Sequence, residues 1–286
     1  MAAADTSRCE GWFHAFGGDE DSSKAASGGG RTWAQCAARA VLRAGALPRS
    51  IAIIMDGNRR FARRQRLDSV FDGHASGFHN LTNVLGWCRD FDVEEVTLYA
   101  FSIENFKRSS EEVDGLMRLA KQKFERLLQE KDKVLRHGVR FRFFGNRSLL
   151  SEEMRCLIDE IERFSAGCTK ARVNVCLAYT STDEMTRAVQ KLARQVTDGE
   201  LDCSDVTLEA FEGALDTSGS RPPDLLIRTS GEHRLSDFLL WQTSYSCLVF
   251  HDVLWPEFSY WHLCGAILKY QLSLASIEKA RQSSAP

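Results

Sequence analysis

The residues that follow the short apolar run Ile51–Met55 could hold a metal ion and an anion. They are Asp56, Gly57, Asn58, Arg59 and Arg60. The aspartate could bind a hard cation through carboxylate oxygen, and the glycine lacks a Cβ, so the backbone there can approach a ligand closely. The asparagine adds neutral donors, and the two arginines carry planar forks that suit phosphate oxygens. On this string alone, the alternative is an aspartate that caps the next helix beside two solvated arginines.

A second polar string follows the run Glu95–Phe101. It contains Ser102, Asn105 and Arg108. Their spacing of three places them on one side of the turn if the segment is helical. An asparagine amide can hold a substrate or a water molecule, although it is a poor base. Ser109 and Glu112 also have the spacing of a capping box for the next helix, so a capped loop is an alternative that can hold at the same time.

A third polar string begins at Arg228, the last residue of the run Leu225–Arg228, and continues through Arg234 and Ser236. Such a set is typical of a second phosphate cradle. A buried arginine is costly to desolvate unless it is paired. A dense polar string beside the apolar letters LLI and FLLW therefore indicates either an internal ion pair with Glu232 or an anionic ligand.

Short β-rich runs and longer helical patterns alternate from residue 51 onward. The strands are expected at Ile51–Met55, Glu95–Phe101, Val139–Phe144, Val173–Ala178, Leu225–Arg228 and Cys247–Phe250. The helices are expected at residues 74–90, 111–137, 151–165, 181–198, 206–214 and 257–278. This alternation predicts an α/β fold in a single domain, with a central, mostly parallel sheet of about six strands flanked by helices. Because ligands bind at the carboxyl ends of such strands, the three strings should meet in one crevice, where several arginines beside one aspartate would suit two diphosphates and a metal ion.

The N-terminal part of the chain differs in composition from the rest. Residues 1–30 are rich in Ala, Gly, Ser and Asp and predict a disordered leader, which leaves one folded domain over 31–280 and a short tail at 281–286. Within the domain, residues 32–46 predict an amphipathic helix. Its apolar positions are Trp33, Cys36, Ala37, Ala40, Val41 and Ala44. This stripe either packs on the domain or contacts a lipid-bearing substrate or a membrane surface.

Composition and motifs argue against several classes of protein. The formal net charge of −2 argues against a nucleic-acid partner bound through a basic surface. The nine Cys contain no CxxC pair, so a reducing compartment is expected rather than a zinc site or a disulfide framework. No run approaches the ~18 apolar residues of a membrane span, and no signal peptide is visible, so we expect a protein that is soluble or lies on a membrane surface. No GxxxxGKS/T, GxGxxG or GxSxG motif supports nucleotide binding or an activated serine.

Four strings resemble the motifs of a known family. MDGNRRFA, LYAFSIENFKR, DLLIRTSGEHRLSDFLLWQ and VLWPEF are similar to those of the undecaprenyl diphosphate synthase family of cis-prenyltransferases, above all to its eukaryotic dehydrodolichyl branch. The likeness extends over nearly the whole chain outside the leader. It implies a Mg²⁺-dependent condensation that extends farnesyl diphosphate with isopentenyl diphosphate in cis, and helices that enclose a hydrophobic tunnel for the growing chain. The product would be a long-chain dehydrodolichyl diphosphate, the precursor of dolichol for protein glycosylation.

The resemblance also implies a role for each matching residue. Asp56 would be the metal-binding catalytic carboxylate, assisted by the polar pair Ser102 and Asn105. The residues that match the allylic diphosphate site are Gly57, Asn58, Arg59, Arg60 and His74. The residues that match the isopentenyl diphosphate site are Arg228, Arg234 and Ser236, and Arg108 would lie between the two diphosphates. The proton acceptor stays open between Asp56, Asn105 acting through a water, and diphosphate itself. Without the family, His74 could equally be a helix-start residue.

Departures from the family pattern predict a partner chain. Arg59 stands where many bacterial members have Gly, which fits the eukaryotic branch. Cys247 aligns with a Glu that serves as a second metal ligand in bacterial members, and Cys is a poor ligand for Mg²⁺. The sequence ends in EKARQSSAP, without the Arg-x-Gly tail of homomeric members. We therefore expect a heteromer with a non-catalytic homologue of the Nogo-B receptor type, which would supply that tail and hold the enzyme on the cytosolic face of the endoplasmic reticulum membrane.

Two other functions would fit the same fold. A catalytically silent partner chain should lack the aspartate and several arginines, all of which are present here. A phosphate-ester hydrolase would need a second metal-binding carboxylate or an activated nucleophile near Asp56, and the sequence offers neither. Product length stays open, because an apolar stripe within residues 111–137 could line a tunnel or belong to ordinary core. Its members are Val113, Leu116, Leu119, Ala120, Phe124, Leu127 and Leu128.

Overall fold

The computed structural model describes residues 32–283. The leader expected at residues 1–30 lies outside this part of the chain. The tail was expected to begin at residue 281, but residues 281–283 belong to the last helix, which ends at Ser283. Between residues 32 and 283, no helix is both long and apolar enough to cross a bilayer.

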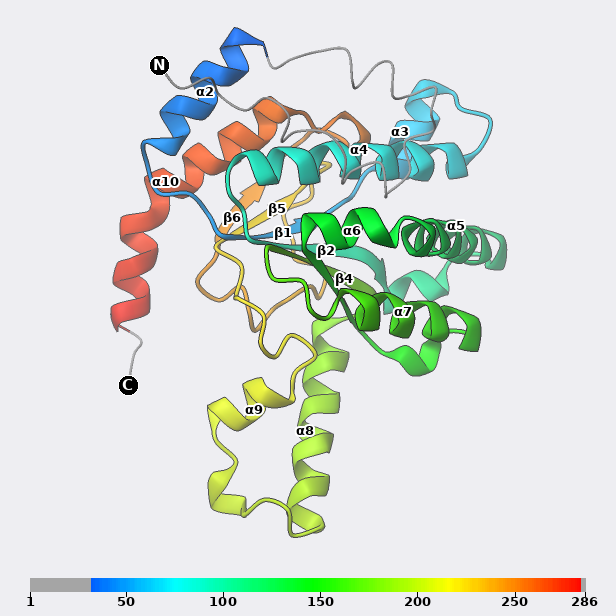
Figure 1. The fold of residues 1–286 in the computed structure, drawn as a ribbon, viewed down its shortest axis with the longest axis vertical. Coiled ribbons are helices and arrows are strands. Elements are labelled where there is room, and N and C mark those ends of the chain that lie inside the picture. Colours follow the sequence, from blue (N-terminus) through cyan, green and yellow to red (C-terminus); the bar gives the residue numbers. More distant parts are fainter. Residues whose placement is uncertain (1–31, 284–286) are drawn as a thin grey trace.

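Six parallel strands form one sheet at the centre of the molecule (Figure 1). In chain order they are β1 (Ser50–Ile54), β2 (Glu95–Ser102), β3 (Val139–Phe144), β4 (Ala171–Tyr179), β5 (Leu225–Arg228) and β6 (Cys247–Phe250). Their order across the sheet is β3-β4-β2-β1-β5-β6. The chain leaves β1 toward β2 on one side and later crosses to β5 on the other. The carboxyl ends of β1 and β5 therefore border a topological switch point, where open parallel sheets bind ligands.

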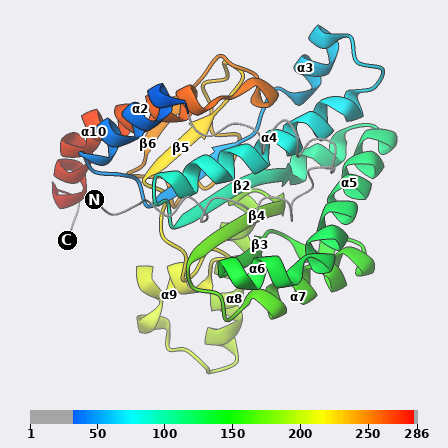
Figure 2. The ribbon, with the colours of Figure 1, turned by 45° about the horizontal axis from the view of Figure 1, so that its top comes forward.

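Nine helices and four short 3-10 turns connect the strands within residues 32–283. The helices are α2 (Trp33–Arg43), α3 (Asn58–Gln65), α4 (Val70–Asp90), α5 (Ser110–Gln129), α6 (Lys131–His137), α7 (Glu152–Ser165), α8 (Ser181–Thr197), α9 (Leu208–Ala214) and α10 (Tyr260–Ser283). The 3-10 turns are η3 (Ile103–Lys107), η4 (Arg147–Leu149), η5 (Cys203–Asp205) and η6 (Trp255–Glu257). Figures 1 and 2 show α4 lying along the sheet, while α8 and α9 extend away from it.

The two faces of the sheet are covered unequally. One face packs against α4, α5, α7 and α10 and forms the larger buried cluster, to which Ile53 belongs. The other face carries a small cluster in which Leu226 is covered by Phe238 and Leu239. These two residues come from the loop that follows β5, and no helix among residues 32–283 contributes a buried residue to this cluster. The helical layer is thus built mainly on one face, and a loop closes the centre of the other.

The predicted strands agree closely with the structure. β3, β5 and β6 have the expected bounds, and β1, β2 and β4 differ by one or two residues at an end. The helix expected over 111–137 is two helices that break at Glu130, and the helix expected to start at 74 begins at Val70. Helix α3 was not predicted, because its sequence NRRFARRQ contains few apolar residues.

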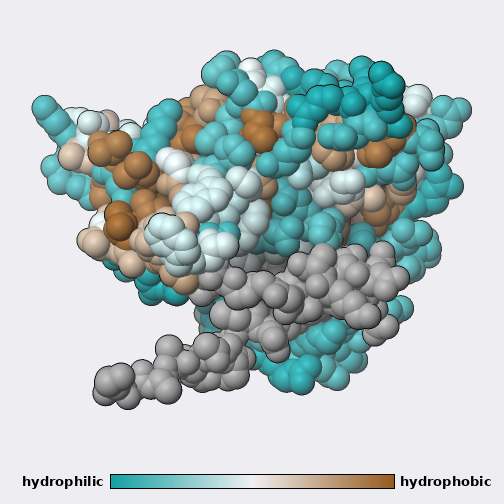
Figure 3. Space-filling model, turned by 90° about the horizontal axis from the view of Figure 1, so that it is seen from above, coloured by the Kyte–Doolittle hydropathy of each residue, from teal (hydrophilic) through white to brown (hydrophobic). Residues whose placement is uncertain are grey.

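Helix α2 turns its apolar stripe away from the domain. Trp33 is 84% exposed and Val41 is 72% exposed. The other stripe positions are exposed as well, namely Cys36, Ala37, Ala40 and Ala44. The opposite side attaches the helix, since Leu42 is buried and Gln271 Nε2 of α10 donates to its carbonyl oxygen at 2.7 Å. The helix therefore packs on the domain, but through the face opposite the predicted stripe, which stays exposed. Figure 3 shows hydrophobic atoms on the left, the side on which α2 and α10 lie in Figure 1.

Helices α3 and α4 touch through glycines. A Cβ on Gly77 would lie 2.1 Å from Asn58 Oδ1 and 2.9 Å from Trp255 Cδ1, and a Cβ on Gly73 would lie 2.4 Å from the carbonyl oxygen of Asn58. Trp255 Nε1 also donates to the carbonyl oxygen of Gly77 at 2.7 Å. The start of α3 can therefore lie against α4 only because these two positions lack side chains, and this contact fixes the segment that follows β1.

We expect Gly77→Ala to destabilise the protein by about 1–3 kcal/mol, because the added methyl group overlaps with Asn58 and Trp255. Gly265→Ala in α10 is the matched control, since no atom of the described residues 32–283 lies within 4 Å of a Cβ there. In an exposed helix that change should be neutral or stabilise by up to ~1 kcal/mol. Free energies of unfolding from urea titrations measure both effects. Equal effects at the two sites would contradict the close contact.

Candidate active site

Asp56 and Arg228 meet at the switch point of the sheet. β1 pairs with β5 so that Ile54 lies beside Arg228, and the turn after β1 brings Asp56 across the end of β5. Arg228 Nη2 donates to Asp56 Oδ2 at 3.0 Å. The Arg228 side chain is only 3% exposed, so this carboxylate compensates a charge that water cannot reach. The first and third polar strings are thus brought together.

The loop after β5 carries the other residues of the third string. Arg228 Nη1 donates to Ser236 Oγ at 2.7 Å and to the carbonyl oxygen of Arg234. Glu232 lies between two further arginines, since Arg60 Nη2 lies 3.4 Å from its Oε1 and Arg234 bonds to its Oε2. Glu232 therefore forms the internal ion pairs that the sequence allowed, while Arg228 pairs with Asp56 instead.

A second charged cluster surrounds Glu112 of α5. Arg108 Nη1 donates to Glu112 Oε1 at 2.7 Å, and Arg59 Nη1 lies 3.7 Å from Oε2. Burial, together with the charges of Arg108 and Arg59, lowers the pKa of His74 to about 4, so the imidazole is neutral near pH 7. Glu112 was expected to close a capping box with Ser109. Ser109 Oγ does accept from Glu112 N at 3.4 Å, but the Glu112 carboxylate turns to the arginines.

The N-terminus of α3 offers backbone donors to the same crevice. Gly57 is the N-cap with a φ of 109°, in the left-handed region that favours glycine. A Cβ there would lie 3.0 Å from Leu254 Cδ2 and 3.1 Å from Ser230 Cβ. No side chain in the described part of the chain caps α3, so the amides of residues 58–60 are available to an anion.

Three buried polar atoms of the predicted site have no hydrogen-bond partner among residues 32–283. They are Asn58 Oδ1, His74 Nε2 and Arg228 Nε. Buried polar atoms are seldom left unsatisfied in folded proteins. The two nitrogen atoms lie in arginine-rich clusters, which indicates a site that is completed by an anionic ligand.

Ser102 and Asn105 form a capping box at η3. Ser102 Oγ accepts from Glu104 N at 3.1 Å, and Asn105 Oδ1 accepts from Ser102 N at 3.0 Å. This cap is not the one predicted at Ser109 and Glu112, and it is compatible with a polar pair that faces a substrate. The cap uses the carbonyl oxygen of the Asn105 amide and leaves its NH₂ group to a substrate or a water.

An apolar cavity of about 130 Å³ lies beside Met55 and His74. It is enclosed by the sheet, through Leu98 and Val175, and by helices α4 and α5. Four residues of the apolar stripe predicted on α5 line it, namely Leu116, Leu119, Ala120 and Phe124. The remaining members pack in the core, namely Val113, Leu127 and Leu128. The predicted stripe is thus partly cavity wall and partly core.

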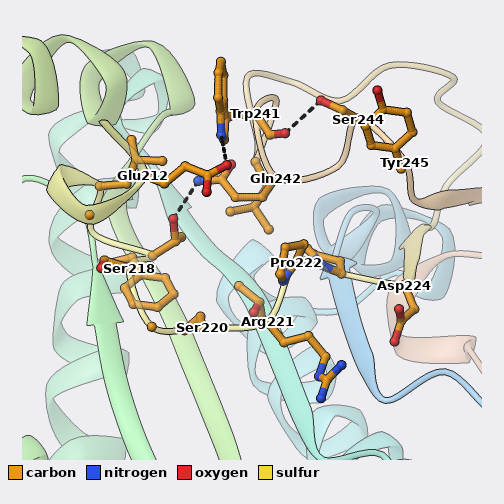
Figure 4. Close-up of a pocket in the computed structure, with 18 of the residues that line it drawn as sticks. Glu212, Ser218, Ser220, Arg221, Pro222, Asp224, Trp241, Gln242, Ser244 and Tyr245 are labelled. Atoms are coloured by element: carbon orange, nitrogen blue, oxygen red, sulfur yellow. Dashed lines mark hydrogen bonds between the residues drawn. The ribbon is translucent and has the colours of Figure 1, made fainter. Parts of the chain in front are cut away.

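A larger, open cavity of about 680 Å³ is lined by residues remote from the predicted site (Figure 4). Trp241 Nε1 donates to Glu212 Oε1 at 3.1 Å on one side of it, and Arg221 and Asp224 line another side. None of the predicted site residues lines this cavity. Its size therefore does not make it the candidate active site, because the charged groups with unsatisfied atoms lie elsewhere.

Cys247 lies away from the crevice. It is the first residue of β6 and pairs with Leu225, the first residue of β5, whereas Asp56 lies at the other end of these strands. Burial raises the pKa of the Cys247 thiol, so it stays protonated near pH 7. Within one chain, Cys247 is therefore too far along the strands to share a metal ion with Asp56.

Two residues of the site were not among the predicted ones. Glu112 holds Arg59 and Arg108, yet its spacing from Ser109 indicated only a cap. Its position four residues after Arg108 was the signal for an ion pair on one helix face. Ser230, which accepts a hydrogen bond from Arg60, carried no such signal, because the contact joins α3 to a loop far along the chain.

Known proteins share both the motifs and the fold. Residues 54–276 match the family model described as putative undecaprenyl diphosphate synthase. The chain is 50% identical over 241 residues to a human dehydrodolichyl diphosphate synthase complex subunit, a match that covers 84% of this chain and 72% of that protein. It is 40% identical over 232 residues to the corresponding complex subunit of Schizosaccharomyces pombe, covering 81% and 88%.

A solved structure supports the same assignment. Lavandulyl diphosphate synthase from Lavandula x intermedia, in complex with dimethylallyl diphosphate, superposes with a TM-score of 0.74 and 31% identity over 79% of this chain and 95% of that one. The family match alone covers well over half of the sequence. This chain therefore belongs to the undecaprenyl diphosphate synthase family of cis-prenyltransferases, enzymes that transfer prenyl groups.

Proposed function

We propose that this chain condenses isopentenyl diphosphate onto farnesyl diphosphate and yields a long-chain cis-polyprenyl diphosphate of the dehydrodolichyl type, the precursor of dolichol. The observation that carries this proposal is the Asp56–Arg228 contact at the switch point, with arginines on both sides and an apolar cavity beside it. Relatives named as dehydrodolichyl diphosphate synthase subunits support the product class. The relative solved with an allylic diphosphate supports the substrate class.

Members of this family use a divalent metal ion, and we propose that Asp56 holds Mg²⁺. The donor fits, because Mg²⁺ is bound by one or two carboxylates together with substrate phosphates and water. Among residues 32–283, no hydrogen bond reaches Asp56 Oδ1, and no cluster of three or more His, Cys, Asp or Glu side chains could hold the metal alone. Diphosphate oxygens would therefore share the ion, and when bound it would neutralise charge on the departing diphosphate.

The arginines divide between the two diphosphates. Arg59 and Arg60, with the free amides at the start of α3, would bind the allylic diphosphate beside neutral His74. Arg228 and Ser236, with Arg234 at the rim, would bind isopentenyl diphosphate. Charge neutralisation by preorganised donors is the main catalytic contribution that such a set can make.

The apolar cavity would receive the growing chain. The cavity lies beside Met55, so its hydrocarbon walls would lie next to the carbon at which diphosphate departs. Such walls exclude water, which would otherwise trap the allylic cation. A hydrolase would instead need a second free carboxylate beside Asp56, and Glu232 is already bonded to Arg60 and Arg234.

We further propose a heteromer with a non-catalytic homologue of the Nogo-B receptor type. The human and fission-yeast relatives are named as complex subunits. The thinly covered face of the sheet suits a second chain, because a parallel sheet needs both faces buried. Exposed Leu208 and Tyr245 line the large cavity in this region, and exposed Leu240 stands between its lining residues Leu239 and Trp241. Apolar side chains around a concavity are typical of such contacts.

We also propose that α2 rests on the cytosolic face of the endoplasmic reticulum membrane. Its exposed stripe, which begins at Trp33 and includes Val41, has the amphipathic form of helices that lie in the membrane interface. Helix α10 lies alongside and exposes Trp261, Leu268 and Leu272. The two helices therefore present one apolar surface.

Asp56→Asn should lower kcat/KM for condensation by at least about 10²-fold, because it removes the charge that holds the metal. The amide oxygen can still accept from Arg228 but no longer balances its buried charge, so the protein should fold with a melting temperature lowered by roughly 10 °C. Asp159→Asn, at a surface ion pair with Arg147, is the control and should keep full activity. Incorporation of labelled isopentenyl diphosphate, with the partner present, measures both. A near-normal rate in Asp56→Asn would refute the assignment.

The partner should increase condensation activity at least about 10-fold over this chain alone, because binding energy across the interface orders an incomplete site. Leu240→Asp should weaken the complex, whereas Leu149→Asp should not. Leu240 is 40% exposed beside the large cavity, and Leu149 is 45% exposed on η4. Light scattering gives the complex mass and the affinity. Full activity of the chain alone, unchanged by the partner, would contradict the heteromer.

The full chain should float with vesicles that contain anionic phospholipid. Trp33→Asp combined with Val41→Asp should abolish this, because each change puts a charge on the apolar stripe that enters the interface. Val189→Asp on exposed α8 is the matched control and should float like the wild type. Equal flotation of all three proteins would mean that α2 does not contact the membrane.

A further inference from the structure

The loop that carries Ser236 has a backbone conformation that few residue types adopt. Ser236, Asp237 and Leu239 have φ angles of 52°, 56° and 47°. None of them is glycine, and the left-handed region is unfavourable for residues with a Cβ. Such a conformation persists only where surrounding contacts determine it. Contacts with neighbouring elements must therefore hold this loop.

The N-terminus of α8 holds the loop through Asp237. Asp237 Oδ1 accepts hydrogen bonds from Thr182 N and Thr182 Oγ1, both at 3.0 Å. The carbonyl oxygen of Asp237 accepts from Ser181 N at 2.7 Å. In return, Leu240 N donates to Ser181 Oγ at 2.8 Å. The loop and the first turn of α8 are thus joined by bonds in both directions.

The residue before Asp237 faces the candidate site. Ser236 Oγ accepts from Arg228 Nη1 at 2.7 Å, and its carbonyl oxygen accepts from the Tyr99 hydroxyl at 3.1 Å. The Phe238 ring stacks on Tyr99, with centroids 4.4 Å apart. Ser236 therefore contacts Arg228 of the site, whereas the Asp237 side chain bonds to α8 and the Phe238 ring packs on Tyr99.

We propose that Asp237 is a positioning residue for the isopentenyl diphosphate site and acts through Ser236. This inference rests on the proposed function. The Asp237 carboxylate ties the loop to α8 and so fixes the left-handed turn at Ser236. That turn keeps Ser236 Oγ and the Arg228 guanidinium directed at one point. Loss of the carboxylate should weaken the binding of isopentenyl diphosphate. It should leave the allylic site, built on α3 and α5, unaffected.

Three substitutions separate the carboxylate from the backbone conformation. Asp237→Ala removes the acceptor and disfavours positive φ, Asp237→Gly removes the acceptor but tolerates positive φ, and Asp237→Asn keeps both properties. We expect the Ala and Gly variants to raise KM for isopentenyl diphosphate about 10-fold, with KM for farnesyl diphosphate within about 2-fold of the wild type. The Asn variant should recover most of the loss, because its amide oxygen can accept from Thr182.

Asp183→Ala is the matched control for α8. Asp183 lies in the same first turn but bonds to Arg187 at 2.7 Å and to Asn146 at 3.2 Å, away from the loop. It should lower the melting temperature without separating the two KM values. If Asp237→Ala does not fold, Thr182→Val provides the same test with one hydrogen bond removed and a smaller KM increase. Equal changes in both KM values, or none, would overturn the positioning role.

Calorimetric binding of isopentenyl diphosphate separates this inference from the proposed function. A wild type that neither binds isopentenyl diphosphate nor condenses it contradicts the proposed function itself. A wild type that does both, with an Asp237→Ala variant that binds equally well, contradicts only the role of Asp237. Weaker binding in the Ala and Gly variants, restored in the Asn variant, supports the inference without relying on turnover.

Discussion

The contact between Asp56 and Arg228 is the interaction on which the site depends, because it joins the two strands at the switch point by their carboxyl ends. The surrounding backbone is tied in the same way. Asp56 N donates to Thr229 Oγ1 at 3.1 Å, Thr229 Oγ1 donates to the Asp56 carbonyl oxygen at 2.7 Å, and Trp255 N donates to that oxygen at 3.0 Å. Three loops therefore converge on one aspartate, and a guanidinium excluded from water sits where they meet. Removing the Asp56 carboxylate would leave the buried charge of Arg228 uncompensated. Asp56 therefore stabilises the fold in addition to its proposed role in catalysis.

The unequal covering of the sheet gives the two faces different tasks. The face under α4 and α5 holds the large core and the apolar cavity, so packing and room for a hydrocarbon chain come from the same helices. The other face holds a small cluster closed by Phe238 and Leu239, which belong to the loop that follows the third polar string. A loop that both seals the core and carries Ser236 is held more firmly than a surface loop, and this suits a site that must keep its geometry before substrate arrives.

Much of this arrangement could be predicted from the sequence, for identifiable reasons. Apolar runs with polar residues at their ends gave the strands within two residues, and the strand-end rule placed Asp56 and Arg228 in one crevice before any distance was known. The prediction was weaker where tertiary contacts decide. Helix α3 has almost no apolar face, and its position rests on Gly73 and Gly77, which no helical periodicity reveals. The outward stripe of α2 and the distance of Cys247 from Asp56 also needed the structure, because a periodic pattern or an aligned position does not say which way a side chain faces.

The carboxylates of Glu112 and Glu232 would make the proposed site selective by charge. Each holds two arginines while no anion is bound, so an incoming phosphate group must compete with a carboxylate that is already in place. A single phosphate group would bring too little charge and too few oxygens to displace the carboxylate. A diphosphate carries more negative charge and more oxygens, and it could engage several guanidinium groups at once. Abundant inorganic phosphate would then be rejected by internal competition, without any steric barrier at the entrance. The acidic residues between the arginines would thus admit only a ligand that carries enough negative charge to displace them.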